Sequence, residues 1–476
     1  MTAPIRAPSP ALLERFAAIV GARYAVTDAA GQAPYLVEPR GRYPGRTPMV
    51  LRPGTTEEVA AILKLANETL TPIVPQGGNT GLVGGQTPHE TGNEIVLSLG
   101  RLDRIRAMDA GANTMTVEAG ATLAKARAAA AEADRLFPLS LASEGTCQIG
   151  GNLATNAGGT AVLAYGTMRE LTLGLEVVLA SGEIWNGLRT LHKDNTGYDL
   201  RDVFVGSEGT LGVVTAAVLK LYPQPRGTAV VFAGLPDLGA VLRFLNEARG
   251  AAGRDLTAFE FMARIGLDFV LRHLPGARDP LASRHEWYVL AEISSLISEG
   301  DAHKRAESIL AAAIADGIVS DAAIAASLAQ ARELWRLREA LSEVQRHEGG
   351  SIKHDVSLPV ARIADFIAEA SAAALKVVPG ARIVPFGHVG DGNVHFNVSQ
   401  PVGADTSAFL SRWDEVNEAV HAVVARYGGS ISGEHGIGRA KRHLLTAVKS
   451  PVEIALMRKL KAALDPNGIL NPGKVL

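Results

Sequence analysis

Apolar positions recur mostly at helical spacing along this chain, with short uninterrupted apolar runs between them. Behind Thr55 the apolar residues repeat at helical intervals through about residue 67, and Glu58 completes a capping box with Thr55. Apolar stretches at 49–53 and 71–75 flank this helix and predict strands. The pattern therefore predicts a strand–helix–strand unit. An earlier helix is expected behind Ser9 as N-cap and Pro10 at its first position.

Further along, the pattern predicts an alanine-rich helix at 123–136 and two strands, 171–180 and 182–185, joined by a Ser-Gly turn. The composition changes at the Tyr-Pro-Gln-Pro sequence of residues 222–225, which predicts a domain boundary. From there to about residue 427, strands alternate with alanine-rich helices. These include predicted helices at 333–344 and 413–426 and a strand of alternating polarity at 351–359.

Composition limits the classes of protein that this chain can belong to. Its 476 residues suggest two or three domains, and the net charge of -2 gives no footprint for nucleic acid. The single cysteine, Cys147, cannot form an intrachain disulfide, and no apolar run reaches the roughly 20 residues that span a bilayer. The N-terminus lacks the basic start and apolar centre of a signal peptide. We therefore expect a soluble cytoplasmic protein without a transmembrane segment.

Glycine is concentrated in three loops within the first 215 residues. They are QGGNTGLVGG at 76–85, SEGTCQIGGNLATNAGG at 143–159 and the glycine-containing stretch 194–215. Backbone N–H groups in such loops can converge on a bound anion because no Cβ blocks the approach. One such loop would be a weak signal, but three suggest one extended ligand. The chain contains neither the dinucleotide fingerprint G-x-G-x-x-G nor a P-loop.

The sequence PFGHVGDGNVHFNV, residues 385–398, predicts a β-hairpin that holds a metal. If residues 390–393 form the turn, Val389 pairs with Val394 and His388 lies directly opposite His395. Glu434, in the sequence SGEHGIG, is the candidate third ligand. Two imidazoles and one carboxylate with open positions form a catalytic metal set. The alternative is a glycine-rich hairpin with two histidines facing solvent.

The three glycine loops resemble the FAD-binding domain of the vanillyl-alcohol-oxidase-like flavoproteins, the FAD-linked oxidases. The closest branch is that of the D-2-hydroxyacid dehydrogenases, which includes D-2-hydroxyglutarate dehydrogenase, D-lactate dehydrogenase and the glycolate oxidase catalytic subunit. The resemblance implies an α+β fold in which a two-subdomain FAD-binding domain is joined to an α+β substrate or cap domain. The implied boundaries are an N-terminal helical segment at 1–40, the FAD domain at 41–225, the cap domain at 226–427 and a C-terminal helical segment, 428–476, that returns to the FAD domain.

The resemblance also implies which residues bind FAD. Members that attach FAD covalently often carry a histidine in the first loop, where this chain has Gly78 and Asn79, so we expect non-covalent FAD. Cys147 is expected to be a small buried residue beside the flavin loops. The implied FAD-binding residues are Pro75, Gln76, Gly77, Gly78, Asn79, Thr80, Gly81, Gly85, Gln86, Ser143, Gly145, Thr146, Gly150, Gly151, Asn152, Thr155, Asn156, Gly158, Gly159, Gly209, Gly212, Val213, Val214 and Asn471.

Substrate-binding residues are implied in the same way. In the D-2-hydroxyglutarate dehydrogenase branch an arginine, a threonine and a lysine hold the substrate carboxylate, and they match Arg338, Ser342 and Lys353. Without the resemblance, these would be solvated surface residues. The serine lacks the methyl group of threonine, which leaves the identity of the substrate open. Asn397 is the candidate for binding a distal carboxylate, and the family pattern assigns His435 to substrate binding and catalysis.

The expected reaction is the FAD- and metal-dependent oxidation of a D-2-hydroxy acid, most like D-2-hydroxyglutarate to 2-oxoglutarate. His435 would take the hydroxyl proton while a hydride moves to flavin N5. We expect Zn²⁺, although Mn²⁺ or Fe²⁺ would fit the same ligands. The alternatives are a D-lactate dehydrogenase, a glycolate oxidase subunit, or a non-catalytic flavin-binding subunit. The expected electron acceptor is an electron-transfer flavoprotein or a quinone, and a homodimer is the default oligomer.

Overall fold

The computed structural model describes residues 7–476, and the chain divides into two compact units. Unit 1 contains the residues up to Gly158, then Thr167–Gln224 and His435–Leu476. Unit 2 contains Gly159–Gly166 and Pro225–Glu434. Both units combine helices with sheets, and the predicted α+β class is confirmed. Among the described residues, no helix has the length and apolar character needed to cross a membrane.

Unit 1 begins with a four-stranded sheet in the order β1-β2-β4-β3, in which β2, β4 and β3 are parallel. The predicted N-caps are confirmed, because Ser9 accepts the N–H of Leu12 and Thr55 accepts that of Glu58. The carboxylate of Glu58 accepts the N–H of Gly54, one residue before the cap. The elements of this layer are α1 (Pro10–Val20), β1 (Ala25–Val26), α2 (Ala29–Leu36), β2 (Val50–Leu51), α3 (Thr56–Thr69), β3 (Ile73–Gln76) and β4 (Ile95–Ser98).

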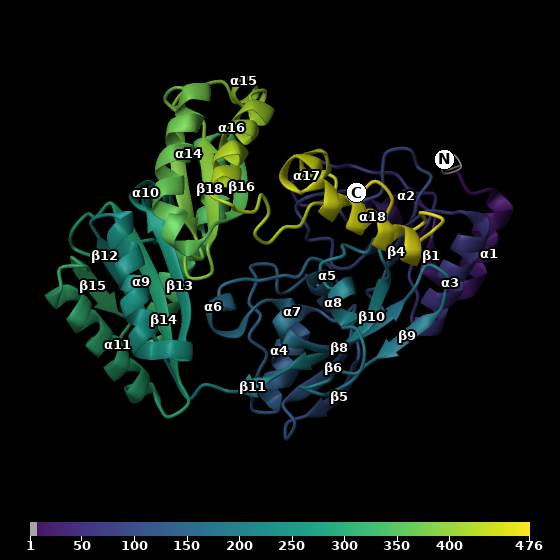
Figure 1. The fold of residues 1–476 in the computed structure, drawn as a ribbon, viewed down its shortest axis with the longest axis horizontal. Helices are drawn as coiled ribbons and strands as arrows, with labels where there is room; N and C mark the ends of the chain where they lie inside the picture. Colours follow the sequence, from purple (N-terminus) through teal and green to yellow (C-terminus); the bar gives the residue numbers. More distant parts are fainter. Residues whose placement is uncertain (1–6) are drawn as a thin grey trace. The chain divides into compact units, whose positions relative to one another are not determined.

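A five-stranded antiparallel sheet, β5-β6-β10-β8-β9, forms the second layer of unit 1 (Figure 1). Its strands are β5 (Ile105–Asp109), β6 (Thr114–Glu118), β8 (Thr172–Val178), β9 (Ile184–Gly187) and β10 (Val213–Lys220), and β7 (Arg135–Leu136) pairs separately with β11 (Tyr222–Pro223). The helices are α4 (Leu123–Glu132), α5 (Ile149–Ala154), α7 (Met168–Leu171), α8 (Arg201–Phe204), α17 (Arg442–Val448) and α18 (Pro451–Leu464). Residues 469–471 extend the first sheet, since Ile73 and Asn471 donate backbone hydrogen bonds across its edge to Ile469 and Ile73. One apolar core includes residues from both sheets and from this C-terminal stretch.

Unit 2 is built on a seven-stranded antiparallel sheet in the order β15-β12-β14-β13-β17-β18-β16. The strands are β12 (Gly227–Leu235), β13 (Leu256–Ala263), β14 (Trp287–Ser295), β15 (Asp321–Ile324), β16 (Ser351–Ser357), β17 (Arg382–Gly387) and β18 (Asn393–Ser399). Helices α10 (Arg264–His273), α12 (Leu328–Glu339) and α13 (Leu341–Val344) cover one face of the sheet with a shared apolar core.

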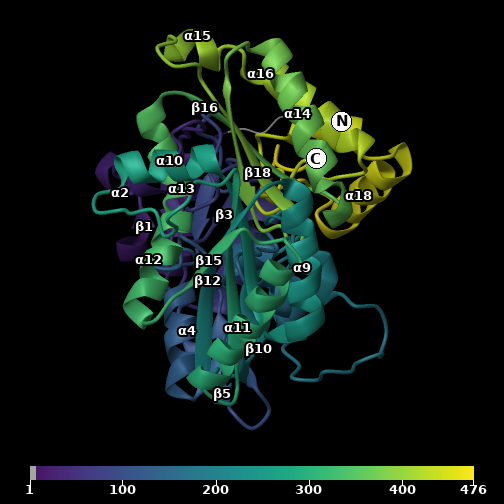
Figure 2. The same ribbon diagram turned by 90° about the vertical axis from the view of Figure 1, so that its left-hand side faces the viewer.

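On the opposite face, Phe244 of α9 (Leu238–Ala252) packs on Phe259, and Phe366 of α14 (Ile363–Val377) packs on Phe396. Helix α14 runs beside α16 (Trp413–Arg426) in both views (Figure 1, Figure 2), and α11 (Glu299–Ala315) contacts α9. Unit 2 also contains α6 (Val162–Tyr165) and α15 (Thr406–Leu410). Short 3₁₀ turns lie at Ala22–Tyr24, Gly253–Asp255, Gln345–Glu348 and Val360–Arg362.

The helix predicted at residues 333–344 is interrupted, and this changes the placement of two predicted site residues. Helix α12 ends at Glu339 and α13 begins at Leu341. Both helices direct leucines into one core, so Arg338 is buried with Leu337 whereas Ser342 is exposed. The predicted continuous helix over residues 333–344 is therefore wrong, and of the two site residues only Arg338 is buried.

A network of charged and polar side chains connects helix α3 to the second sheet of unit 1. Arg106 bonds Glu118 at 3.1 Å and Glu176 at 3.0 Å, and Glu176 also accepts hydrogen bonds from Thr56 and Thr215. Both glutamates are buried. Burial raises the pKa of each glutamate, but the hydrogen bonds from Arg104 to Glu118 and from Arg106 to Glu176 lower it below the ordinary value.

We predict that Arg106→Met lowers the free energy of unfolding by about 3 kcal/mol, because it leaves the buried carboxylate of Glu176 without its cation and leaves Glu118 with Arg104 alone. The loss should be largest near neutral pH and shrink as the pH falls below the ordinary pKa of glutamate, where the unpaired carboxylate becomes protonated. Urea unfolding at two pH values measures it. Arg104→Met is the matched control, since Arg104 bonds the same Glu118 but is 70% exposed, and it should cost much less. Equal losses for the two variants would contradict this account.

Candidate functional site

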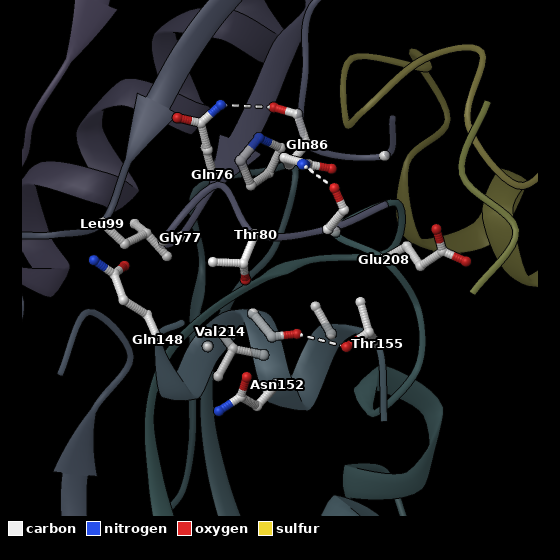
Figure 3. Close-up of a pocket in the computed structure, with 18 of the residues that line it drawn as sticks. Gln76, Gly77, Thr80, Gln86, Leu99, Gln148, Asn152, Thr155, Glu208 and Val214 are labelled. Atoms are coloured by element: carbon white, nitrogen blue, oxygen red, sulfur yellow. Dashed lines mark hydrogen bonds between the residues drawn. The ribbon is translucent and has the colours of Figure 1, made fainter. Parts of the chain in front are cut away.

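A cleft in unit 1 brings the three glycine loops together (Figure 3). Its walls come from the end of β3 and the loop after it, from α5, from the turn before β10 and from the C-terminal segment. The lining residues are Pro75, Gln76, Gly77, Gly78, Asn79, Thr80, Gly81, Val83, Gly85, Gln86, Leu99, Gln148, Gly150, Gly151, Asn152, Ala154, Thr155, Ser207, Glu208, Gly209, Gly212, Val213, Val214 and His435.

The first glycine loop is held in place by close backbone approach. A Cβ on Gly78 would lie 1.9 Å from the carbonyl oxygen of Thr146, so only glycine lets these two loops meet. Asn79 adopts a left-handed backbone with a φ of 55°. Gln76 fixes the loop from inside, because its Nε2 donates to the carbonyl oxygens of Tyr35 and Gln86, each at 2.9 Å. These contacts hold the first glycine loop in one conformation, with its backbone lining the cleft.

Most of the predicted FAD-binding residues line this cleft, and the others lie outside its lining. Asn471 lies behind the wall and donates to the carbonyl oxygens of Gly85 and Glu208. The predicted residues outside the lining are Ser143, Gly145, Thr146, Asn156, Gly158, Gly159 and Asn471. The sequence analysis missed the lining residues Val83, Leu99, Gln148, Ala154, Ser207 and Glu208, although Gln148 and Glu208 lie within the glycine clusters that it identified.

The chemistry of the cleft fits a flavin dinucleotide. Gln76 Oε1, Gln148 Oε1 and Asn152 Nδ2 are buried and have no hydrogen-bond partner among the described residues. Such atoms are costly unless a ligand satisfies them. Leu99 and Val214 add apolar surface to the same walls (Figure 3). Exposed backbone N–H groups, unpaired amides and apolar side chains together match a ligand with a phosphate portion and a planar polar ring.

In unit 2, His388, His395 and Glu434 form a group that could hold a metal ion. One ligand atom from each lies within 4.8 Å of the others. His388 Nε2 is 3.6 Å from Glu434 Oε1, and His395 Nε2 is 4.0 Å from Glu434 Oε2. The two imidazole rings are nearly perpendicular, with centroids 5.4 Å apart. Both Nε2 atoms thus approach one carboxylate, which is how a cation would be surrounded.

The hairpin that carries these histidines has a different register from the predicted one. Phe386, not His388, pairs with His395, and residues 388–392 form the loop. The predicted pairing of His388 with His395 is therefore wrong by two positions. Because strand side chains alternate with period two, a shift of two keeps both histidines on the same face. The histidines still meet, as diagonal rather than direct neighbours.

The other imidazole nitrogens face carboxylates that the sequence analysis did not identify. Glu260 on β13 is fully buried, and its Oε1 is 2.6 Å from His388 Nδ1. His395 Nδ1 is 4.0 Å from Asp355 Oδ1, and Asp355 Oδ2 accepts the backbone N–H of Glu434 at 2.9 Å. Carboxylates behind histidines in this way orient the imidazoles of metal sites. The donor set and its supporting residues therefore fit a divalent cation.

Electrostatics favour a cation at the same place. Burial raises the pKa of Glu434 to about 7, with help from the neighbouring Asp355 and Asp391, although His388 opposes the shift. Burial lowers the pKa of His388, but Glu260 and Glu434 raise it to a net value of about 9. A group with this excess of buried carboxylates is stabilised by added positive charge.

Three of the predicted substrate residues come together beside this group. Lys353 and Asn397 are cross-strand partners on β16 and β18, and Lys353 Nζ donates to the backbone oxygen of Ser342 at 2.8 Å. Asn397 Nδ2 also donates to Gln345 Oε1 at 3.1 Å. Arg338 has a separate partner, since its Nη2 lies 2.6 Å from Glu260 Oε2 and its guanidinium stacks over Phe386. Arg338 therefore contacts the carboxylate that orients His388.

His435, the predicted catalytic residue, lines the cleft of unit 1, whereas Glu434 belongs to unit 2. One peptide bond joins them, so their Cα atoms are about 3.8 Å apart. The backbone after His435 is held by Glu208, whose carboxylate accepts the N–H groups of Ile437 and Gly438 at 2.7 and 2.8 Å. The last residue of unit 2 is thus a member of the potential metal group, and the next residue along the chain lines the cleft of unit 1.

Family models match both parts of the chain. The model described as FAD binding domain matches residues 47–187, and that described as FAD linked oxidases, C-terminal domain, matches residues 224–475. The chain is 37% identical over 435 residues to D-2-hydroxyglutarate dehydrogenase, mitochondrial, of Arabidopsis thaliana, covering 91% of this chain and 76% of that protein. It is 40% identical to D-2-hydroxyglutarate dehydrogenase of Xanthomonas citri pv. viticola, covering 89% and 88%.

Solved structures share the fold at lower identity. The chain matches p-cresol methylhydroxylase with a TM-score of 0.78 at 16% identity, covering 100% of this chain and 98% of that one. It matches 4-ethylphenol oxidase from Gulosibacter chungangensis with a TM-score of 0.75 at 20% identity, covering 98% and 96%. With the family models, these likenesses confirm the predicted vanillyl-alcohol-oxidase type of fold.

One sequence prediction is contradicted by the relatives. Those from Arabidopsis thaliana and Rattus norvegicus are named mitochondrial, which speaks against the cytoplasmic location expected from the sequence. That expectation rested on the lack of a signal peptide and of disulfides. Neither feature distinguishes one reducing compartment from another.

The family assignment rests on both domain models and on relatives that are similar along most of the chain. It confirms the resemblance predicted from the glycine loops and the order of the motifs. With the FAD-binding domain model over the cleft residues of the first loop, it also confirms FAD as the predicted flavin. The chain belongs to the FAD-linked oxidases, in the branch that contains the D-2-hydroxyglutarate dehydrogenases.

Proposed function

We propose that this protein oxidises D-2-hydroxyglutarate to 2-oxoglutarate, with FAD held non-covalently in the cleft of unit 1 and a divalent metal, Zn²⁺ by preference, held by His388, His395 and Glu434. The observation that carries the proposal is that two consecutive residues, one in each unit, belong to the two parts of the proposed site. A residue of the potential metal group, Glu434, is followed at once by His435, which lines the cleft. The relatives named D-2-hydroxyglutarate dehydrogenase support the substrate.

The substrate carboxylates are assigned to the cationic and polar side chains of unit 2. Lys353 and Asn397 share one face of the sheet with His395, and Ser342 lies against Lys353. We assign Arg338 two roles: it neutralises Glu260 behind His388, and it contributes positive charge for the substrate carboxylate. Asn397 is the proposed donor to the distal carboxylate. Holding a substrate at two ends fixes the orientation of C2.

His435 accepts the proton of the substrate hydroxyl at an imidazole nitrogen as the hydride leaves C2. FAD, when bound, supplies the N5 atom that takes this hydride. A divalent metal on His388, His395 and Glu434 would lower the pKa of an adjacent hydroxyl. Glu260 and Asp355 keep the Nδ1 side of each histidine occupied, so that both Nε2 atoms face Glu434. Zn²⁺ suits two imidazoles and a carboxylate, and Mn²⁺ or Fe²⁺ would accept the same set.

D-Lactate is the second candidate substrate. A putative D-lactate dehydrogenase of Schizosaccharomyces pombe is 37% identical over 458 residues. Ser342 also replaces the threonine of the D-2-hydroxyglutarate dehydrogenase pattern. Flavin reduction by the two acids, compared under anaerobic conditions, distinguishes these substrates. The proposed electron acceptor is an electron-transfer flavoprotein or a quinone, since the sequence has no nicotinamide fingerprint, and the proposed oligomer is a homodimer.

The first loop provides a test of the flavin linkage. Because Gly78 and Asn79 occupy the positions where covalent members often carry histidine, acid denaturation should release all of the yellow colour into the supernatant. Absorbance of the supernatant and of the redissolved pellet measures the partition. Flavin that stays with the precipitated protein would rule out the non-covalent state.

The metal group makes a second prediction. Removing the metal with a chelator should abolish turnover without releasing FAD, since the ligands belong to unit 2 and the cleft to unit 1. His388→Ala and His395→Ala should each lower the metal content measured by mass spectrometry. His303→Ala is the control, because His303 on α11 bonds the backbone oxygens of Glu299 and Ala325 and should leave the metal content intact. Fully active protein without bound metal would refute the assignment.

The third prediction concerns His435. His435→Ala should retain FAD and metal but reduce its flavin roughly 10²–10⁴-fold more slowly, the usual contribution of a positioned base. KM should change much less, because Lys353 and Arg338 remain. His443→Ala, in the exposed part of α17, is the control and should reduce flavin at the normal rate. Stopped-flow reduction with metal analysis on the same sample decides the matter, and a metal-replete His435→Ala enzyme of wild-type rate would end the assignment.

A further inference from the structure

Glu208 occupies an unusual position in the cleft of unit 1. It lies in the sequence VGSEGTLG with a left-handed backbone, φ 51°. Its backbone N–H bonds the carbonyl oxygen of Ala154 at 2.8 Å, and its own carbonyl oxygen accepts the Nδ2 of Asn471 at 2.8 Å. The backbone is therefore fixed on both sides, and the side chain points toward the C-terminal segment (Figure 3).

The carboxylate of Glu208 holds the segment that follows His435. Oε1 accepts the N–H of Ile437 at 2.7 Å, and Oε2 accepts that of Gly438 at 2.8 Å. Two N–H groups on one carboxylate form a charge-assisted pair, which is stronger than ordinary backbone bonds. Gly438 is fixed further because its carbonyl oxygen accepts the N–H of Val475 at 3.1 Å.

Two nearby glycines, Gly436 and Gly85, lie so close to this carboxylate that a side chain at either position would crowd it. A Cβ on Gly436 would lie 2.7 Å from Glu208 Oε1, and one on Gly85 would lie 3.2 Å from Oε2. Gly436 and Gly438 have positive φ angles of 80° and 50°, conformations that the segment would leave readily without a restraint. Burial raises the pKa of Glu208, while the two N–H donors and Lys441 favour its charged form. A glycine-rich segment next to the proposed catalytic histidine thus has two of its backbone N–H groups held by one side chain.

We propose that Glu208 is a positioning residue for His435, because its carboxylate fixes the backbone of Ile437 and Gly438 and thereby sets where the His435 imidazole lies along the cleft. This inference rests on the proposed role of His435 as the base. Catalytic groups must be held within a fraction of an ångström, and a displacement of about 1 Å can cost about 100-fold in rate. Glu208 acts through His435 and is assigned no contact with the substrate.

The test compares Glu208→Gln and Glu208→Asp in the FAD-loaded enzyme with D-2-hydroxyglutarate. Glutamine keeps the shape but turns an amide NH₂ toward one of the two N–H groups. Glu208→Asp keeps the negative charge but shortens the side chain, which moves the carboxylate away from both N–H donors. Glu208→Gln should slow flavin reduction about 10- to 100-fold, leave KM nearly unchanged and shift the pH profile of the reduction rate. Glu118→Gln is the control, a buried glutamate of the same unit that does not line the cleft, and should leave the rate per bound FAD unchanged.

A double variant separates positioning from a structural role. If Glu208 acts through His435, the variant carrying both Glu208→Gln and His435→Ala should be no slower than His435→Ala alone. Additive losses, a wild-type rate per bound FAD in Glu208→Gln, or a rate loss matched by loss of FAD would each overturn the inference. His435→Ala at the wild-type rate would instead overturn the proposed function. A slow His435→Ala beside an unaffected Glu208→Gln would overturn only the positioning role.

Discussion

The fully buried carboxylate of Glu260 is the constraint on which the organisation of unit 2 depends. An ionised carboxylate without solvent is tolerated only when it is paired and hydrogen-bonded. Glu260 is hydrogen-bonded to His388 Nδ1 and forms an ion pair with Arg338 Nη2, each at 2.6 Å. These partners come from the loop after β17 and from α12, so satisfying one charge fixes a loop and a helix against β13. The orientation of His388 follows from that pairing.

Unit 1 is governed by a different constraint, the close approach of backbone to backbone. The first and second glycine loops meet where Gly78 touches Thr146, at a distance that no side chain permits. Amide side chains stabilise these loops by hydrogen bonds, because Gln76 and Asn471 donate to loop carbonyl oxygens. The result is a cleft whose walls present backbone and unpaired amide atoms. Such a wall recognises the general shape of a cofactor, whereas the charged side chains of unit 2 suit a small acid.

Sequence patterns predicted features that depend on neighbours along the chain. The caps at Ser9 and Thr55 were predictable because the side chain bonds an N–H three residues away. The sequence correctly predicted that His388 and His395 lie close together, although the predicted register was wrong. The alternation of side chains along a strand determines which face of the sheet a residue occupies, but not which residue it pairs with. Glu260 could not be predicted, since it lies 128 residues from His388 in a strand with no recognisable motif. The break between α12 and α13 was missed because both helices bury leucines in one core, and tertiary packing overrode a continuous helical pattern.

The segment from Gly433 to Gly438 shows how these two kinds of constraint meet in one stretch of chain. It contains three glycines around Glu434 and His435, and glycine backbone alone would not hold either side chain in place. Asp355 of unit 2 accepts the N–H of Glu434, and Glu208 of unit 1 accepts those of Ile437 and Gly438. Each unit thus fixes its own side of the junction with a carboxylate. Glycine permits the tight backbone path, and the two carboxylates select one conformation from the many that glycine allows. Because Glu434 and His435 are adjacent, a restraint on either side of them limits the movement of both.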